Sequence, residues 1–353
     1  MHTPLLYKDK PLFAIDIGHS TVKVVQLQRD KTGIRVIGYG YADFDPSAVE
    51  KGVITKPDLL VKALKPLLKQ VVIGELTTDR AVVAIPTAHI FTRVITLPTI
   101  ENTDLETAVE LEADQYVPLP AEEVHLDYTV TSESTDEHPE TMVLMVAAPK
   151  KIVASYIDLL DQLDLEVYAM EPSLFAIMRA VNHARANSSP KVVIDFGSES
   201  SDLAIYDGNV QLTSTITTGG MHISRQIAET LNIEAHQAED IMSRVGIKKS
   251  KWQEQLAPAL APILSRLADE VQKMLRYHHD HTNFDQPIEE IVIVGGGANL
   301  PGLSDFLAHL TGLAVSTCDP WQNLNIAPLQ PPHQLETTLY TTAVGLALKE
   351  MES

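Results

Sequence analysis

One sequence pattern occurs twice in this chain, and it constrains the fold more than any other feature. The first copy, FAIDIGHSTVKVVQL, begins at Phe13, and the second copy, VVIDFGSESSDLAIYDG, begins at Val192. Each copy predicts a buried strand that ends in Asp-Xaa-Gly, a turn of small hydroxyl residues and a second strand. The copies lie about half the chain length apart, and 353 residues exceed one comfortable hydrophobic core. The repeat therefore predicts two α/β lobes that face a shared cleft.

The overall charge limits the kind of partner that the surface can attract. Lys and Arg number 27 against 47 Asp and Glu, so the formal net charge is −20. An acidic surface repels nucleic acid and anionic lipid, so a phosphate ligand must be held by local backbone donors, helix N-termini or a bound cation. The single cysteine, Cys318, excludes a disulfide framework or a cysteine zinc site within one chain. The sequence shows neither a signal-peptide pattern nor a run of about 18 apolar residues, so we expect a cytoplasmic protein without direct membrane insertion.

The two Asp-Xaa-Gly turns carry the residue types that a magnesium–phosphate site requires. Asp16 and Asp195 end their strands and are predicted to hold Mg²⁺, through water because magnesium keeps much of its hydration shell. Gly18 and Gly197 let the backbone approach an anion closely. Hydroxyl groups for the same site are offered by Ser20, Thr21, Ser198, Ser200 and Ser201. The alternative is that each aspartate only caps a hairpin turn, and the second copy makes this alternative weaker.

A glycine-rich loop follows the second copy after a mainly helical segment. The stretch VIVGGGANLPGL, which begins at Val292, predicts a strand, a bare glycine turn and a helix. Together with the two hairpins, this loop resembles the adenosine loop of the actin, sugar-kinase and DnaK-chaperone superfamily. The resemblance implies ATP or ADP as the cofactor, with Mg²⁺. It assigns the adenosine contacts to Gly295, Gly296, Gly297 and Asn299.

Within that superfamily, the sequence resembles the PilM family of type IV pilus assembly proteins, which are relatives of the cell-division protein FtsA. The resemblance runs nearly end to end, and the stretch EADQYVP from Glu112 to Pro118 is its most typical part. The extra segment follows Pro86, whereas actin and MreB insert a subdomain before the helix predicted at 57–72. The resemblance implies an α/β, two-lobed actin-like (ribonuclease H-like) fold with an FtsA/PilM-type inserted subdomain in the first lobe.

The same resemblance implies how the chain divides. A turn-rich stretch, ANSSP at 186–190, is the expected linker between the lobes. The expected parts are a first actin-like lobe at 10–85 and 166–188, an inserted subdomain at 86–165, a second actin-like lobe at 191–220 and 286–353, and a helical subdomain of the second lobe at 221–285. Each lobe then contributes one hairpin to the cleft.

The resemblance also assigns site residues, position by position. The positions that match the two phosphate loops, and the glycine pair before the helical subdomain, are Gly18, His19, Ser20, Thr21, Lys23, Gly197, Ser198, Ser200, Gly219 and Gly220. His19 departs from the serine usual in the family, and Glu199 places an acid beside the phosphates. Glu270 and Lys273 match a helix that reaches ribose and adenine, or else they form a solvated helix face. Glu171 aligns with the glutamate that positions the attacking water in some bacterial actins, or else it stabilises the N-terminus of the following helix.

The family implies an ATP-binding cytoplasmic assembly protein, peripheral to the inner membrane, in a type IV pilus or related secretion machine. Its nucleotide state would tune partner binding, with at most slow hydrolysis. The partner would be the cytoplasmic N-terminal tail of PilN, held in a groove between the first lobe and the inserted subdomain and lined by positions Arg93 to Leu97 and Leu111 to Pro118. A small-molecule kinase of the same superfamily and an FtsA-like filament former are the alternatives. The resemblance further implies contacts with other pilus platform proteins and allows a homo-oligomer.

Overall fold

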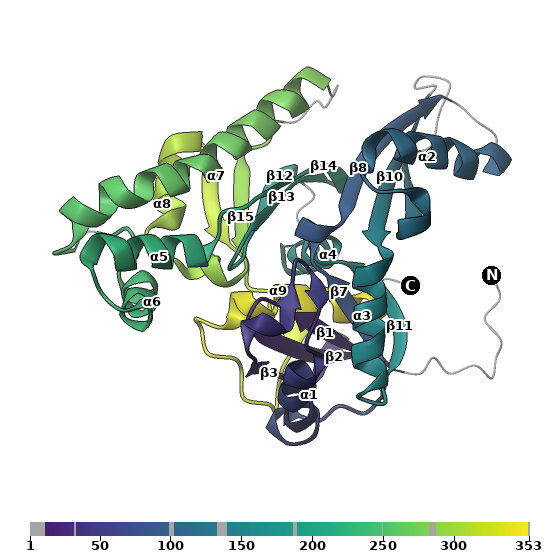
Figure 1. Ribbon diagram of the computed structural model, residues 1–353, viewed down its shortest axis with the longest axis horizontal. Helices are drawn as coiled ribbons and strands as arrows, with labels where there is room; N and C mark the ends of the chain where they lie inside the picture. The colour runs from purple at the N-terminus through teal and green to yellow at the C-terminus, as the bar shows by residue number, and fades with distance from the viewer. Residues whose placement is uncertain are drawn as a thin grey trace.

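The computed structural model describes residues 11–31, 33–98, 102–132, 140–185, 189–248, 250–281 and 287–351. The strands in these ranges form two large sheets, a three-stranded sheet and a two-stranded ribbon of β4 (Val49–Glu50) and β5 (Val53–Ile54). In Figure 1 the large sheet that contains β1 lies below the one that contains β12, and the three-stranded sheet projects to one side. None of the helices in the described ranges is both long and apolar enough to cross a bilayer.

The first large sheet has the strand order β11-β7-β1-β2-β3-β17, with β6 beside β3. Its strands are β1 (Phe13–Ile17), β2 (Thr21–Asp30), β3 (Gly33–Asp43), β6 (Ile73–Gly74), β7 (Arg80–Ile85), β11 (Glu166–Pro172) and β17 (Leu324–Asn325). The central strand β1 is apolar apart from Asp16 and is buried along its whole length, as expected for a strand covered on both faces. It pairs antiparallel with β2 and parallel with β7.

The second large sheet repeats this plan, with the order β14-β13-β12-β15-β16. Its strands are β12 (Lys191–Phe196), β13 (Ser201–Asp207), β14 (Asn209–Ile216), β15 (Glu290–Val294) and β16 (Ala314–Thr317). Strand β12 pairs antiparallel with β13 and parallel with β15, as β1 does with β2 and β7. The two turns also close alike, because the Gly18 N–H donates to the Thr21 carbonyl (2.9 Å) and the Gly197 N–H donates to the Ser200 carbonyl (3.0 Å). The sequence repeat is therefore a structural repeat.

Between β7 and β11 the chain builds a separate antiparallel sheet with the order β8-β10-β9. Its elements are β8 (Phe91–Pro98), α2 (Asn102–Tyr116), β9 (Val124–Ser132) and β10 (Glu140–Pro149), followed by α3 (Lys150–Asp161). One face of the sheet packs against α2, with Val143 and Met145 of β10 against Leu105 and Val109 of the helix. Figure 1 shows this sheet and α2 projecting away from both large sheets. We call these strands and α2 the inserted sheet.

Helices cover both faces of the first large sheet. On one face lie α1 (Pro57–Pro66) and α3, and on the other lie α4 (Ser173–Arg185) and α9 (Thr341–Ala347). The sequence predicts that 286–353 belongs to the second lobe, but the end of this range joins the first sheet, because β17 pairs with β3 and α9 packs on α4, β1 and β2. Gly345 permits this close packing, since a Cβ there would lie 1.8 Å from the Ala176 carbonyl oxygen. An apolar helix pattern does not state which sheet it covers, so sequence alone could not place this segment.

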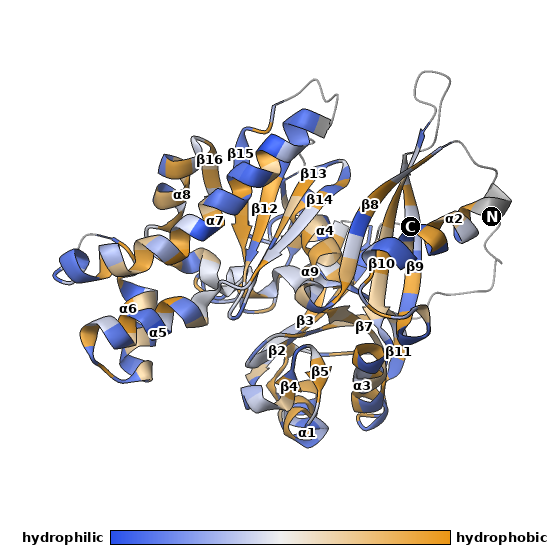
Figure 2. Cartoon of the chain, turned by 45° about the horizontal axis from the view of Figure 1, so that its top comes forward, coloured by the Kyte–Doolittle hydropathy of each residue, from blue (hydrophilic) through white to orange (hydrophobic). Residues whose placement is uncertain are grey.

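The second sheet is covered by a mainly helical region. Its helices are α5 (Gly220–Leu231), α6 (Ala235–Arg244), α7 (Gln253–His281) and α8 (Leu303–Thr311). The buried positions of α7 include Leu260, Leu264 and Leu267, which recur at helical spacing and pack against β12, β13 and β15. Figure 2 shows the result, with hydrophobic strands in the sheet and alternating polar and apolar stretches along α7.

Candidate functional site

Both Asp-Xaa-Gly hairpins end at one cavity of about 330 Å³, which we call the cleft. One wall comes from the first sheet, the opposite wall comes from the second sheet, and the glycine loop after β15 closes one side. The sequence-predicted residues that line it are Asp16, Gly18, His19, Ser20, Thr21, Lys23, Asp195, Gly197, Ser198, Ser200, Gly295 and Gly296. The structure therefore brings the two halves of the repeat and the glycine loop together.

The first hairpin carries a neutralised pair of charges. Asp16 on β1 stands directly opposite Lys23 on β2, and the Lys23 Nζ lies 3.4 Å from Asp16 Oδ2. Both side chains are largely buried, with 12% of the aspartate and 9% of the lysine exposed. The lysine amine also lies close to Gly18, where a Cβ would come within 2.9 Å of it. This hairpin therefore presents a compensated carboxylate and a cation beside the turn.

The second hairpin carries two acids in the same arrangement. Asp195 on β12 stands directly opposite Asp202 on β13. Burial, together with the carboxylates of Asp202 and Asp16, raises the pKa of Asp195 to about 7, and Lys23 offsets part of the rise. Burial also raises the pKa of Asp202 to about 6, against the effect of a hydrogen bond from the Thr215 hydroxyl. A bound cation would relieve this excess of negative charge.

Glycines shape the backbone around the second hairpin. Gly295 has a φ of 81°, which glycine adopts without strain, and a Cβ there would lie 2.3 Å from Asp195 Oδ1. At Gly219 a Cβ would lie 2.4 Å from the Ser198 carbonyl oxygen. Helix α5 then begins at Gly220, whose N–H donates to the Gly197 carbonyl at 3.0 Å. The glycine positions predicted from the sequence thus let three chain segments approach one another around Asp195.

A contact across the cleft joins the two turns. The His19 Nδ1 lies 3.4 Å from Glu199 Oε1, with 22% of the histidine and 60% of the glutamate side chain exposed. His89 also lines the cleft, and burial lowers its pKa while Glu199 offsets part of the fall. The histidine at position 19 and the acid at position 199, both unusual beside a phosphate site, therefore face each other.

A second cavity of about 680 Å³ adjoins the cleft and shares Ser20, Gly197 and Gly296 with it. It contains three further predicted residues, Gly220, Gly297 and Asn299. The Asn299 side-chain amide donates to the Leu335 carbonyl (2.8 Å) and to the Thr338 hydroxyl (3.0 Å), so it fixes the loop. The sequence did not point to the α6 residues that form another wall, which are His236, Glu239, Asp240, Met242 and Ser243. On sequence alone α6 is an ordinary polar surface helix.

Glu270 and Lys273 lie outside both of these cavities. They sit one turn apart on α7, and the lysine amine is 3.2 Å from Glu270 Oε1. The same carboxylate oxygen accepts a hydrogen bond from the Ser214 hydroxyl of β14 at 2.6 Å. The structure therefore uses Glu270 to connect α7 to the edge of the second sheet, and their predicted contact with ribose and adenine stays a prediction.

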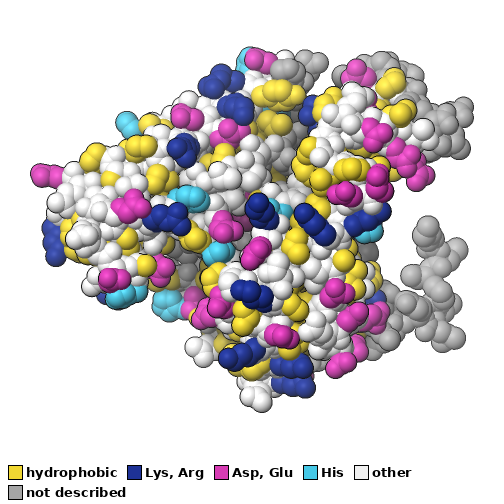
Figure 3. All heavy atoms as spheres, viewed as in Figure 1, with side chains coloured by type: hydrophobic (Ala, Val, Ile, Leu, Met, Phe, Trp, Pro, Cys, Tyr) yellow, Lys and Arg dark blue, Asp and Glu magenta, His cyan; other side chains and the backbone are white. Residues whose placement is uncertain are grey.

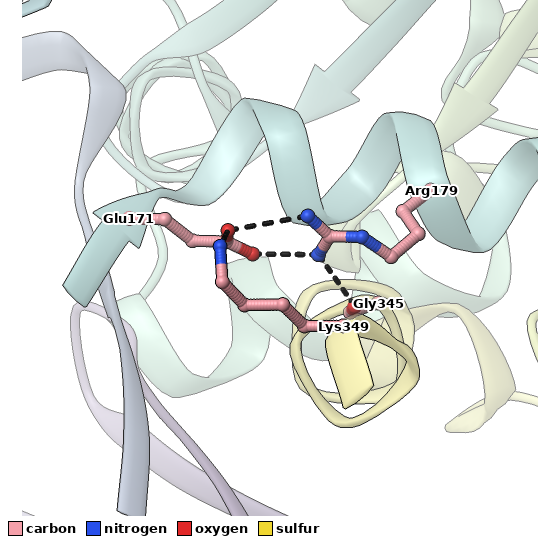
Figure 4. Close-up of polar contacts among 4 residues, drawn as sticks. All are labelled: Glu171, Arg179, Gly345 and Lys349. Atoms are coloured by element: carbon pink, nitrogen blue, oxygen red, sulfur yellow. Dashed lines mark hydrogen bonds and ion pairs between the residues drawn. The ribbon is translucent and has the colours of Figure 1, made fainter. Parts of the chain in front are cut away.

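Glu171 also lies outside the residues that line the cleft, and Figure 4 shows its surroundings. Its carboxylate, at the end of β11, accepts hydrogen bonds from Arg179 of α4 (2.6 and 3.2 Å) and from Lys349 (2.6 Å). Arg179 donates further to the Gly345 carbonyl of α9 at 2.8 Å. The carboxylate is buried and already engaged by two cations, so in this structure it joins α4 to the end of α9.

Two grooves flank the β13–β14 hairpin. The first, of about 840 Å³, lies between the first large sheet with its helices and the inserted sheet, and its lining includes Ile157, Glu171, Phe175, Thr129 and Leu144. The second, of about 640 Å³, has β8 and α2 on one side and β14 on the other. Of the positions predicted for the partner groove, Arg93, Val94, Thr96, Tyr116 and Val117 line the second groove, which faces the second sheet. We call these the first groove and the edge groove.

The charges and the backbone of the cleft decide which ligand it suits. The described residues hold no group of three or more His, Cys, Asp or Glu placed to coordinate a metal together. Burial and the neighbouring carboxylates nonetheless disfavour the ionised form of Asp195, and a hydrated cation held through water would favour it. The glycine-lined backbone beside Lys23 fits an anion. The residues present therefore fit a magnesium–phosphate group.

Comparison with known proteins supplies the family. A sequence profile described as type IV pilus assembly protein PilM matches residues 14–351. The chain belongs to the PilM family. Among solved structures, it is similar to a PilM-PilN type IV pilus biogenesis complex, with a TM-score of 0.84, 23% identity, and coverage of 98% of this chain and 99% of that chain.

Two further structures show how widely this PilM family fold is shared. One is the ethanolamine utilization protein EutJ from Carboxydothermus hydrogenoformans, with a TM-score of 0.55, 16% identity, and coverage of 97% of this chain and 90% of that chain. The other is an MreB protein of Spiroplasma citri bound to AMPPNP, with a TM-score of 0.55, 12% identity, and coverage of 98% of both chains. At such identities these likenesses establish the fold. The predicted α/β actin-like fold and the predicted family are thus confirmed.

Proposed function

We propose that this PilM family protein binds ATP or ADP with Mg²⁺ in the cleft and binds the cytoplasmic N-terminal tail of a PilN-like membrane protein in the first groove. The nucleotide state tunes the affinity for the tail, and hydrolysis is slow at most. The protein acts at the cytoplasmic face of the inner membrane, where its protein partner holds it. Its role is assembly of a type IV pilus.

The excess of acid at the second hairpin is the observation that carries the nucleotide proposal. Two acids face each other at Asp195 and Asp202, and burial raises the pKa of each, with the carboxylates of Asp202 and Asp16 adding to the rise at Asp195. Folding tolerates such a cost where a ligand later removes it. The similar MreB structure is bound to AMPPNP, which supports a nucleotide as that ligand.

The shape of the first groove supports it as the site of the tail. Its walls come from both the first lobe and the inserted sheet, which is the location that the family resemblance implies. Apolar side chains such as Ile157, Met170 and Phe175 are interspersed with polar ones, as in grooves that bind a short peptide. The similar solved structure is described as a PilM-PilN complex, which supports a PilN-like partner.

Two packed elements connect the cleft to the first groove. Helix α4 contributes Ser173 to the cleft and Phe175 and Arg179 to the groove. The segment that contains α9 contributes Thr342 to the cleft and Lys349 to the groove. At the groove end, Glu171 accepts hydrogen bonds from Arg179 and Lys349 and so joins these two elements. Movement of either element on nucleotide binding would therefore reach the groove, which is the physical basis for nucleotide-dependent partner binding.

The proposal is tested by two titrations on the full chain. A fluorescent ATP analogue is titrated with and without Mg²⁺, and a labelled peptide of the PilN-like tail is titrated with and without saturating Mg·ATP. We expect binding of the analogue to require Mg²⁺, and we expect Mg·ATP to change the tail affinity by about fivefold or more. Tail affinity that is the same in both nucleotide states would contradict the coupling.

Matched variants separate the two sites. Ile157→Glu places a charge in the first groove, where this side chain is 39% exposed, and should weaken tail binding while Mg·ATP binding is unchanged. Val130→Glu is the control, because Val130 is similarly exposed at 36% and does not line the groove. Phosphoryl transfer from ATP to members of a sugar panel would instead favour a kinase, and pelleting of filaments with ATP would favour an FtsA-like polymer.

A further inference from the structure

The outer edge of β8 is an unpaired strand edge that faces a second unpaired edge. Within the described ranges, strand β8 pairs only with β10 and β14 pairs only with β13. Among the described residues, no backbone hydrogen bond outside the sheet ladders involves 91–98 or 209–216. Each strand therefore presents a row of backbone donors and acceptors that no backbone group of the described chain uses. Such edges readily accept an added strand.

The two edges form the walls of the edge groove. Several residues of the two strands lie close together, and there the hydroxyls of Thr92 on β8 and Thr213 on β14 share a hydrogen bond of 3.0 Å. Around this contact the edge groove has a volume of about 640 Å³. In Figure 3 a hollow separates the part of the surface that carries α7 from the part that carries α2. The groove is thus a slot with β8 along one side and β14 along the other.

The electrostatics of the slot favour an acidic occupant. Arg93 is the single charged side chain among the described residues that line it, and its guanidinium lies 3.7 Å above the centre of the Tyr116 ring. No ion pair in the described part of the chain involves Arg93. The rest of the lining combines hydroxyls, such as Thr96 and Thr215, with apolar side chains. In a protein with a net charge of −20, an exposed arginine without a carboxylate partner marks a local site for an anion.

We propose that the edge groove binds an extended segment of a partner protein, which adds as a strand to the outer edge of β8 and places a carboxylate on Arg93. Main-chain hydrogen bonds to β8 supply the pairing, and side chains on one face of the segment contact the hydroxyl-rich edge of β14. This site is separate from the first groove, because the tip of the β13–β14 hairpin at Gly208 lines the first groove whereas its stem at Gln211 lines the edge groove. The proposal therefore does not depend on the PilN-like tail.

A designed peptide tests this site. The probe is a fluorescent, end-blocked nonapeptide of alternating threonine and valine with a central glutamate. Its binding to the full chain is followed by anisotropy, and hydrogen–deuterium exchange locates it. We expect slower exchange of the amides in 91–98. We also expect affinity about tenfold weaker for Arg93→Gln, because a charge-assisted contact is lost. Arg225→Gln, which removes an exposed arginine of α5, is the matched control and should leave the affinity unchanged.

Altered peptides distinguish strand addition from other kinds of binding. Two N-methylated peptides are compared, one methylated at the odd residues and the other at the even residues, so that each lacks the backbone donors of one edge. The peptide that lacks the donors on the edge facing β8 should lose binding, and the other should keep it. Replacement of the central glutamate by lysine should weaken binding about tenfold or more. Equal affinity for the glutamate and lysine peptides, or no protection at 91–98, would overturn the proposal. Protection of β8 that appears without peptide and grows with protein concentration would also overturn it, since the occupant would then be a second copy of the chain.

Discussion

The two hairpins of the repeat share one backbone plan but carry opposite electrostatics. At equivalent positions in the cross-strand register, Asp16 faces Lys23 in the first hairpin and Asp195 faces Asp202 in the second. The first pair is a buried ion pair at 3.4 Å, whereas the acids of the second pair have raised pKa values. We call the first hairpin complete, because it holds its own counter-ion, and the second hairpin incomplete, because it sets one buried acid against another.

This difference shows how a duplicated unit can divide the work of a binding site. Lys23 supplies a positive charge beside the glycine turn, which suits phosphate, while Asp195 and Asp202 supply the negative charge that suits Mg²⁺. Glu171 gives a third case, because it ends a strand of the same sheet as Asp16 but is neutralised by Arg179 and Lys349. A carboxylate at the end of a strand is thus a candidate to bind a cation when no basic side chain of the protein pairs with it.

The largest effect is expected from breaking the complete hairpin. Lys23→Met leaves Asp16 buried without its counter-ion and should lower the free energy of unfolding by about 4 kcal/mol. Chemical denaturation at neutral pH measures this change. Lys69→Met, which removes an exposed lysine, is the control and should change stability by less than about 0.5 kcal/mol. A loss no greater than that of the control would show that the ion pair does not stabilise the hairpin.

Replacement of Glu171, the acid that links α4 to the segment containing α9, should lower the stability somewhat less. Glu171→Gln should lower the free energy of unfolding by about 3 kcal/mol, because Arg179 and Lys349 lose their counter-ion while the amide still accepts a hydrogen bond. Lys349 is 36% exposed, so solvent screens part of the loss. ATP turnover is measured on the same variant. Turnover lost with stability intact would instead support the role of Glu171 in positioning the attacking water.

The incomplete hairpin should respond in the opposite way to loss of its acid. Asp195→Asn removes a buried carboxylate whose pKa is raised, so the unliganded protein should become more stable, while Mg·ATP affinity falls about 100-fold. Calorimetry with Mg·ATP and thermal unfolding without it measure the two effects. Asp114→Asn on α2 serves as the control for loss of an exposed acid. A destabilised Asp195→Asn variant would show that the second hairpin is as self-sufficient as the first.

The smallest effect is a pH dependence of the unliganded protein. The pKa of Asp195 is about 7 in the folded state and 3.8 for the free group. The folded state therefore binds the proton more tightly, and the stabilisation is fully present below pH 3.8 and is lost as the pH rises through 7. Between pH 5 and pH 8 the unfolding free energy of the wild type should fall about 2 kcal/mol more than that of Asp195→Asn. If the unfolding free energies of the two proteins change with pH in the same way, the electrostatic difference proposed between the hairpins would be wrong.

Much of the cleft could be predicted because its signals are local. A buried strand, an aspartate at its end and a glycine turn are adjacent in sequence, so the repeat at Asp16 and Asp195 and the loop at Gly295 indicated both lobes and their meeting point. The position of the inserted sheet after Pro86 was equally local. These features depend on residues that are neighbours in the sequence and on the backbone geometry that such residues favour, so they can be predicted from the sequence.

The tertiary structure decided which distant groups meet. It opposed Asp202 to Asp195, engaged Glu171 with Lys349, placed α9 on the first sheet, and left the edge of β8 beside β14. None of these contacts follows from a sequence period, because a period states that a helix or strand has a buried face but not which partner covers it. The sequence by itself determined the repeat, the family and the residues of the two turns. Long-range packing alone decided which carboxylates pair with a basic side chain and which face another acid.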